Sequence, residues 1–445
     1  MKRSRQIEYA IIGFAVLMTV ACSGAQIVST TQQPSGNPPA VPVASHSENK
    51  TIRFLEDRVS RDPDDFIAHN KLASEYLQQL RETGDFAYLQ LAGRAAKSSL
   101  AALPAEQNKG GLASLIQVQF ASHDFVSVRE NAKRLIELEP NKGYPFQFLG
   151  DAYLELGQYE DAEAAFREME SLGGISALTK VAIQQRLARL AFLHGDNKEA
   201  ARRFGIALKI ASTMIEPPKE TVAWCQLQLG ETAFATGDLK SAEKYFRASL
   251  TTFPDYFRSL AALGRLRAAQ GDLTAAVEFY EKAVRILPDP VFVAALGDLY
   301  KLAGRTQDAE AQYALVEKIG QLSAASGTLY NRQLALFYAD HDIKAEEAYT
   351  NAAKEYEVRR DIYGADAVAW TALKAGKITE AQTAIKDALR LGTKDAKFFY
   401  HAGMIEHASG NRTEAKRFLE LSLKTNPGFD PLHSVNAKSV LEALK

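Results

Sequence analysis

The sequence predicts an all-α fold, a right-handed solenoid of about ten stacked helical hairpins with a capping helix at each end. Three observations predict it. Apolar residues recur at helical spacing over most of the 445-residue chain. These helical periods come in pairs, and half of the pairs are joined by Gly-Asp or Gly-Asn. In the middle of the chain the paired unit recurs after 34 and then 33 residues.

The N-terminus has the features of a targeting signal. A short basic head precedes an apolar run over residues 10–20, and the run ends at Ala21-Cys22. A bilayer-spanning helix needs about 20 apolar residues, so this run suits the hydrophobic core of a secretory signal peptide over residues 1–21. The junction resembles the lipobox of bacterial lipoproteins, which implies cleavage before Cys22 and lipidation of that cysteine. Secretion with cleavage after Ala25, or an uncleaved anchor, are the alternatives.

The resemblance also implies a place in the cell. A lipoprotein of this kind faces the periplasm from a bacterial membrane. Because Ser23 is not aspartate, the resemblance implies anchoring in the outer membrane if the envelope is Gram-negative. Residues 22–50 contain four prolines among serine, threonine, glutamine and asparagine, which predicts a disordered tether after the lipidated cysteine. A flexible chain of that length reaches about 30 Å and would hold the folded part away from the membrane.

Three consecutive units show the repeat most clearly. They contain Leu229-Gly230, Gly237-Asp238, Ala242, Phe246 and Pro254, then Leu263-Gly264, Gly271-Asp272, Ala276, Tyr280 and Pro288, then Leu296-Gly297, Tyr300, Gly304, Ala309 and Tyr313. The glycine before aspartate suits the left-handed residue that ends the first helix, and the aspartate suits the cap of the second. Small residues let the two helices approach closely, the aromatic ring fills the space between hairpins, and proline ends the second helix.

This pattern resembles the tetratricopeptide repeat (TPR) family over about residues 60–430. We expect a TPR solenoid of ten units, because one hairpin alone cannot bury its apolar face. Repeats 1–4 occupy residues 51–216, repeats 5–7 occupy 219–320, and repeats 8–10 occupy 328–445. Capping helices are expected at about 51–61 and 433–444. The first unit has room for an extra turn before Gly84, and the eighth fits the pattern least.

Two seams interrupt the array. Pro217-Pro218 follows a lengthened helix, and residues 320–328 precede the eighth unit. We expect the solenoid to bend at both seams, which are either hinges or tolerated loop insertions.

Composition and motifs argue against several function classes. A formal net charge of −1 does not favour a nucleic-acid binder, which needs a basic surface. The two cysteines cannot form a disulfide framework, and we expect Cys225 to pack in the core. No phosphate-binding loop, dinucleotide motif, zinc-protease motif or nucleophile elbow is present, so we expect no enzyme activity.

The histidines also give no metal signature. His401 and His407 are six residues apart, a poor spacing for one helix face. The cluster over residues 340–342, Asp-His-Asp, stands where other units carry their turn, which favours a helix cap over a cation site. The sequence therefore predicts no metal, no cofactor and no catalytic residue.

The TPR resemblance implies that the first helix of each hairpin lines a concave groove. At position 9 of units 3 to 7 stand residues of alternating charge: Asp151, Arg189, Glu231, Arg265 and Asp298. Neighbouring helices pack about 8–10 Å apart, so long side chains of this charge ladder can pair between units. The ladder either fixes the curvature of the solenoid or offers a mixed-charge groove to a peptide.

The same mapping gives the C-terminal units a different groove. Its inward positions carry a predicted partner-binding set: Tyr363, Asp366, Trp370, Tyr400, Met404 and His407. Clustered aromatic side chains provide large contact area with little loss of entropy on binding. These rings either bind a partner or pack between repeats. If they bind, replacing Trp370 or Tyr400 with alanine weakens binding and leaves the helical content intact.

The function that we expect is a non-catalytic protein-binding scaffold of the bacterial cell envelope. It would present the concave groove to a protein or peptide, and the lipid on Cys22 would anchor it to the membrane. The alternative is an accessory role in polysaccharide export or protein secretion through an outer-membrane channel. A self-assembling structural role also stays open.

Overall fold

The computed structural model describes residues 49–172, 176–325 and 331–444. This part of the chain forms 22 α-helices and no strand. The predicted signal peptide, the predicted lipidation at Cys22 and most of the predicted tether lie outside the described residues. No described helix has the length and apolar character to cross a bilayer.

The helices form ten antiparallel hairpins between two single helices, α1 (Lys50–Arg61) and α22 (His433–Ala443). Hairpins 1 to 5 are α2 (Phe66–Thr83) with α3 (Ala87–Ala102), α4 (Lys109–Ala121) with α5 (Phe125–Leu138), α6 (Gly143–Glu155) with α7 (Tyr159–Ser171), α8 (Ala177–Leu193) with α9 (Asn197–Ser212), and α10 (Lys219–Ala235) with α11 (Leu239–Thr252). Hairpins 6 to 10 are α12 (Phe257–Ala269) with α13 (Leu273–Ile286), α14 (Pro290–Leu302) with α15 (Thr306–Ala325), α16 (Arg332–Asp340) with α17 (Ala345–Tyr356), α18 (Ile362–Lys374) with α19 (Ile378–Ala388), and α20 (Ala396–Ala408) with α21 (Arg412–Thr425). The predicted fold of ten hairpins between two capping helices is confirmed.

The turn chemistry explains the hairpins. Gly237 has φ of 76°, and Gly271 has φ of 80°, the left-handed conformation that glycine adopts without strain. The carboxylate of the following Asp238 accepts a hydrogen bond from the N–H of Ser241 at 3.0 Å, and so caps the second helix. In hairpin 8 the turn has no glycine, and Asp342 and Lys344 take positive φ instead. This non-glycine turn and the nine-residue α16 agree with the weak repeat pattern there.

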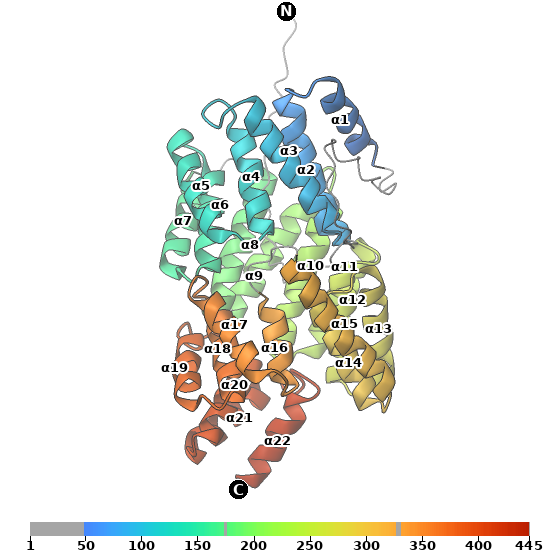
Figure 1. The fold of residues 1–445 in the computed structure, drawn as a ribbon, viewed down its shortest axis with the longest axis vertical. Helices are drawn as coiled ribbons and strands as arrows, with labels where there is room; N and C mark the ends of the chain where they lie inside the picture. Colours follow the sequence, from blue (N-terminus) through green and yellow to red (C-terminus); the bar gives the residue numbers. More distant parts are fainter. Residues whose placement is uncertain (1–48, 173–175, 326–330, 445) are drawn as a thin grey trace, which may run out of the picture.

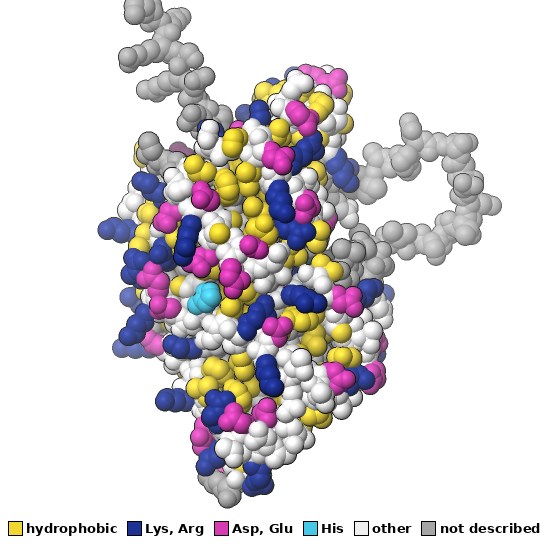
Figure 2. All heavy atoms as spheres, turned by 90° about the vertical axis from the view of Figure 1, so that its left-hand side faces the viewer, with side chains coloured by type: hydrophobic (Ala, Val, Ile, Leu, Met, Phe, Trp, Pro, Cys, Tyr) yellow, Lys and Arg dark blue, Asp and Glu magenta, His cyan; other side chains and the backbone are white. Residues whose placement is uncertain are grey.

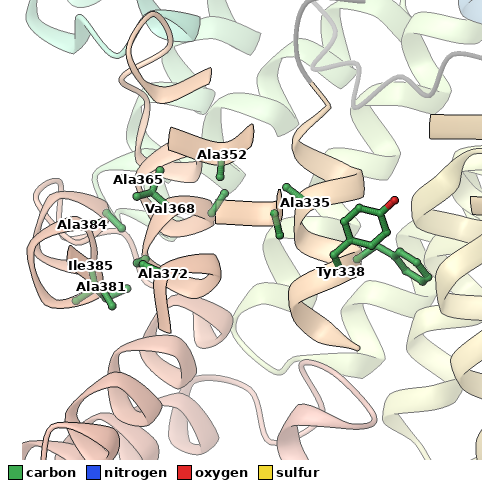
Figure 3. Packing of buried hydrophobic residues seen from close by; sticks show 14 of the residues in the cluster. Ala335, Tyr338, Ala352, Ala365, Val368, Ala372, Ala381, Ala384 and Ile385 are labelled. Atoms are coloured by element: carbon green, nitrogen blue, oxygen red, sulfur yellow. The ribbon is translucent and has the colours of Figure 1, made fainter. Parts of the chain in front are cut away.

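Small residues set the spacing within each hairpin. A Cβ atom on Gly230 would stand 2.4 Å from the Phe246 ring, and one on Gly264 would stand 2.5 Å from the Tyr280 ring. In both pairs a glycine therefore faces an aromatic ring across the hairpin. The core continues from hairpin to hairpin as a series of apolar clusters. Figure 3 shows one of them, rich in alanine: Ala335, Tyr338, Ala352, Ala365, Val368, Ala372, Ala381, Ala384 and Ile385.

The array packs across the first predicted seam. The rings of Phe204 on α9 and Trp224 on α10 meet edge to face, with centroids 5.9 Å apart, on either side of Pro217-Pro218. At the second seam α15 continues through Gly320 to Ala325. Residues 326–328 of that seam lie outside the described part.

The solenoid winds tightly enough for successive turns to touch. The turn between the two helices of a hairpin lies against the linker that follows the fifth hairpin further along the chain. The turn of hairpin 1, for example, meets the linker after hairpin 6. The contacts are Gly84 with Leu287, Gly157 with Arg360, Gly195 with Gly392, and Gly237 with Thr425. Figure 1 shows the result, with α17–α21 lying below α5–α9. Hydrogen bonds join the layers: the Asn426 amide donates to the carbonyl of Phe234 at 2.8 Å, and the Thr393 hydroxyl donates to the carbonyl of Leu193.

Candidate functional site

The predicted charge ladder forms at one step. Arg265 donates to the Glu231 carboxylate, as the mapping predicts. The other members find different partners. Arg189 lies 5.3 Å from the centre of the Tyr363 ring, and Asp298 bonds to His341 at 2.8 Å. A continuous ladder along the first helices was therefore the wrong expectation, because neighbouring elements compete for its charges.

Asp151 shows this competition most strongly. It is 4% exposed and is bound by Arg186, three residues before the predicted Arg189, through three hydrogen bonds of 2.6–3.1 Å. Burial raises the pKa of Asp151 to about 6, although the Arg186 guanidinium opposes the shift. A buried bidentate pair of this kind fixes the relation of α6 to α8 and is not a free surface charge.

Trp370 and Tyr400, the main aromatic residues of the predicted partner-binding set, are each 1% exposed. They belong to one apolar cluster with Ala339, Leu419 and Ala437. The expectation that these two rings stand open in a groove is corrected: the chain covers them with its own elements. Asp366 is also buried, Tyr363 and Met404 are half-buried, and only His407 of the predicted set is exposed.

The covering elements are the end of α16 and the start of α22. The Trp370 indole N–H donates to Asp340 Oδ1 at 2.7 Å, and its ring stacks on His401 with centroids 4.2 Å apart. The Tyr400 ring stacks on His433, with centroids 4.7 Å apart, and its hydroxyl accepts from the Asn436 amide at 2.8 Å. The C-terminal helix therefore occupies the inner face of the last two hairpins.

These contacts bring together a partly buried polar cluster, which we define as Asp340, Asp366, Lys397, His401 and His433. His401 Nδ1 lies 2.8 Å from Asp366 Oδ1, and Lys397 Nζ lies 3.3 Å from Asp340 Oδ2. His433 Nε2 lies 3.5 Å from Asp340 Oδ1. Within the described residues, Asp340, His401 and His433 form the one group whose nitrogen and oxygen atoms are close enough together to hold a metal ion.

Burial shapes the charges of this cluster. It lowers the pKa of His401 well below the usual range, with the Lys397 charge acting in the same direction. Burial also raises the pKa of Asp366 to about 7, against the attraction of Lys397. For Asp340 burial is outweighed by Lys397 and then His433, and the pKa falls to about 2. At neutral pH the cluster therefore combines a charged Asp340 with a neutral His401.

Sequence reasoning missed this cluster for a simple reason. Asp340, His401 and His433 are separated by 61 and 32 residues and lie on three different helices. No sequence motif with a fixed spacing could therefore identify them. The predicted turn at residues 340–342 is present, but its side chains diverge. Asp340 joins the cluster, His341 bonds to Asp298, and Asp342 pairs with Lys374 at 2.6 Å.

Cys225 lies in the core, as expected, and is fully buried. Burial raises the pKa of its thiol to about 12. A thiol of this kind is protonated and inert at neutral pH.

Some first-helix side chains remain open to solvent. On α14, Val291 is 45% exposed and Leu302 is 41% exposed. At the end of α20, Met404 is half-buried and His407 is exposed. Figure 2 shows that on one face of the molecule acidic and basic side chains are interspersed with apolar ones.

Comparisons with known proteins agree with this architecture. A tetratricopeptide repeat family model matches residues 227–289 and 367–428, and a second model of the same repeat matches residues 146–172. No curated protein matches the chain significantly.

Solved structures that align with this chain include the APC/C hetero-tetramer Cut9-Hcn1, with 13% identity over 88% of this chain and 92% of that chain, and a TM-score of 0.33. PilW, described as a widely conserved type IV pilus biogenesis factor, has 20% identity over 50% of this chain and 94% of that chain, with a TM-score of 0.38. BtubC from P. vanneervenii has 23% identity over 47% of this chain and 92% of that chain, with a TM-score of 0.37. The segments that the two family models match correspond to hairpins 3, 5, 6, 9 and 10. The chain thus contains tetratricopeptide repeats within a solenoid of ten helical hairpins.

Proposed function

We propose that this protein is a non-catalytic scaffold that binds a protein or peptide partner at the surface of a bacterial cell envelope. The observation that carries the proposal is the tandem array of helical hairpins with tetratricopeptide repeats in three stretches. Stacked repeats offer an extended surface on which a few anchor residues supply most of the binding energy.

The binding surface that we propose consists of first-helix side chains that stay accessible: Val291 and Leu302 on α14, and Met404 and His407 on α20. The first pair is apolar, and the second combines an apolar thioether with an imidazole, which suits an amphipathic or extended segment. Trp370 and Tyr400 contribute indirectly, by holding the inner wall together.

Partner capture tests this surface. Residues 23–445 are immobilised and exposed to a detergent extract of the native envelope. Two double variants, Val291→Glu with Leu302→Glu and Met404→Glu with His407→Glu, are compared with the parent chain. The matched control is Val126→Glu, which changes a 40% exposed valine on α5, a second helix. We expect a partner that the parent and the control retain and that one double variant loses.

Other outcomes decide between the remaining functions. Equal retention by all variants would move the site to the outer face. Capture of an outer-membrane channel component would favour the accessory role in export or secretion. If the parent captures nothing, the scaffold proposal gives way to a self-assembling role.

We propose further that lipid on Cys22 and the segment over residues 22–50 tether the scaffold to the membrane, which raises its effective concentration near membrane partners. The basic head, the apolar run and the Ala21-Cys22 junction support this part. Expression with labelled palmitate should label the parent chain and leave Cys22→Ser unlabelled. Equal labelling of both would refute lipidation at this cysteine.

A further inference from the structure

We infer that Asp340, His401 and His433 form a binding site for a divalent transition-metal ion of the zinc class, and that the ion fastens α22 to α16 and α20. The three residues come from the end of α16, the middle of α20 and the first position of α22. The inference does not depend on the proposed partner.

The distances suit such an ion. The candidate ligand atoms of the three residues lie within 4.8 Å of one another, and His433 Nε2 and Asp340 Oδ1 are 3.5 Å apart. Zinc binds nitrogen and oxygen at about 2.1 Å, so two tetrahedral ligands stand about 3.4 Å apart. Small side-chain movements therefore bring all three ligands to one ion, and water can take the fourth position.

His401 is oriented as metal ligands usually are. It is fully buried, and its Nε2 has no hydrogen-bond partner. Its Nδ1 lies 2.8 Å from Asp366 Oδ1, so this nitrogen makes the hydrogen bond of the ring and Nε2 is the nitrogen left for an ion. His433 lacks this support, because its Nδ1 has no hydrogen-bond partner and stands 3.7 Å from Asp430 Oδ1. A carboxylate behind the imidazole, as Asp366 stands behind His401, is the common outer shell of histidine-bound metals.

The charge balance also favours a cation. The polar cluster contains two carboxyl groups, those of Asp340 and Asp366, and one lysine, Lys397. Lys397 is the present partner of Asp340 Oδ2, and its side chain is 34% exposed. A bound ion would replace the ammonium group, which can move into water. Asp340, whose side chain is 21% exposed, provides the path of entry.

Core packing alone explains only part of this geometry. It accounts for the stacking of His401 on Trp370 and of His433 on Tyr400. It does not account for a buried imidazole nitrogen without a partner, because burying such a group without a hydrogen bond costs free energy. Coordination of an ion would satisfy that nitrogen and would lock α22 over the inner face of hairpins 9 and 10.

The test uses residues 23–445 without a polyhistidine tag, stripped of metal by a chelator. Co²⁺ is titrated and followed by visible absorption, and Zn²⁺ by calorimetry and by thermal unfolding. We expect one ion per chain, the intense visible bands of low-coordinate Co²⁺, a higher Tm with Zn²⁺, and slower amide exchange in α22.

Variants assign the site. His433→Ala should abolish the Co²⁺ bands, and Asp366→Asn should weaken affinity about 10- to 100-fold by disturbing the orientation of His401. The matched control is His407→Ala, which removes an exposed histidine from the same helix α20 and should bind like the parent. Circular dichroism establishes that each variant is folded.

Three results would overturn the inference: no stoichiometric binding by the folded parent, undiminished binding by folded His433→Ala, or loss of binding in His407→Ala. If His433→Ala does not fold, the conservative His433→Gln replaces it, and the parent titration still decides whether a site exists.

Discussion

The hydroxyl of Tyr159 accepts a hydrogen bond from the backbone N–H of Ile362 at 2.8 Å, although 203 residues separate the two. Tyr159 begins α7 in hairpin 3, and Ile362 begins α18 in hairpin 9. The bond joins one turn of the solenoid to the next. The contact between layers also reaches the predicted inner surface, where Arg189 of hairpin 4 lies 5.3 Å from the centre of the Tyr363 ring of hairpin 9.

A substitution at Gly157 should test the contact between layers. Gly157 has φ of 77°, and an added Cβ would stand 2.1 Å from the carbonyl oxygen of Arg360. Gly376 has φ of 73° and open space around it. Gly376→Ala should therefore cost only the left-handed strain, about 1–2 kcal/mol. Gly157→Ala should cost about 1–3 kcal/mol more, since it also forces the layers apart.

Chemical denaturation measures both costs, and small-angle scattering measures the expected expansion of the Gly157 variant. Equal destabilisation by the two substitutions would mean that the layers do not touch in solution.

Overpacking within a hairpin should be severe at Gly264. A Cβ there meets the Tyr280 ring at 2.5 Å, whereas a Cβ on Gly205 of α9 meets nothing within 4 Å. Gly264→Leu should destabilise the fold by about 3 kcal/mol or more. Gly205→Leu should stabilise it by about 0.5–1 kcal/mol through helix propensity. Thermal melting of the two variants checks the repeat register, and a parent-like Tm for Gly264→Leu would contradict it.

Removing the Trp370 side chain should destabilise the C-terminal hairpins. Trp370→Ala empties a site that is 1% exposed and should cost about 3–5 kcal/mol. Trp370→Phe keeps most of the ring but loses the hydrogen bond to Asp340, which should cost about 1–3 kcal/mol. Urea titration of the metal-free chain gives both values. A stable, helical Trp370→Ala that only loses partner binding would restore the original groove hypothesis.

The acid stability of the fold should depend on Asp361. Arg332 donates to both carboxylate oxygens at 2.9 and 2.7 Å and also pairs with Glu355 at 2.8 Å. Burial opposes ionisation of Asp361, but the two guanidinium groups of Arg332 and Arg359 outweigh it and lower its pKa. A folded pKa below the unfolded value of about 3.9 gives stability that is complete above that value. This stability is lost as the pH falls through the folded pKa.

Arg332→Met tests the sign of this dependence. It removes the guanidinium that Asp361 and Glu355 share, and only Glu355 keeps an ion pair, with Arg359 at 2.9 Å. Breaking the buried pair with Asp361 should cost about 3–5 kcal/mol at neutral pH. Acid protonates those carboxylates, so the gap between variant and parent should narrow below about pH 4. Urea denaturation at several pH values measures the gap. A gap that does not change with pH would show that Asp361 is not held ionised by Arg332.

Local and periodic features were predictable from the sequence. The ten hairpins, both capping helices and the glycine turns follow from neighbouring residues, because helix periodicity, left-handed glycine and aspartate caps act over a few positions. The spacing of Gly264 and Tyr280 likewise predicts which residues face each other within one hairpin.

Tertiary structure alone decided which surfaces stay open. The rise and rotation of each hairpin add up until hairpin 8 meets the turn of hairpin 3, and small angular differences accumulate over that distance. Packing between neighbouring elements likewise decides that Asp151 pairs with Arg186, that α22 covers Trp370 and Tyr400, and that Asp340 meets His401 and His433. Position within one repeat determines which way a side chain points, but the packing of the whole array determines what it meets there.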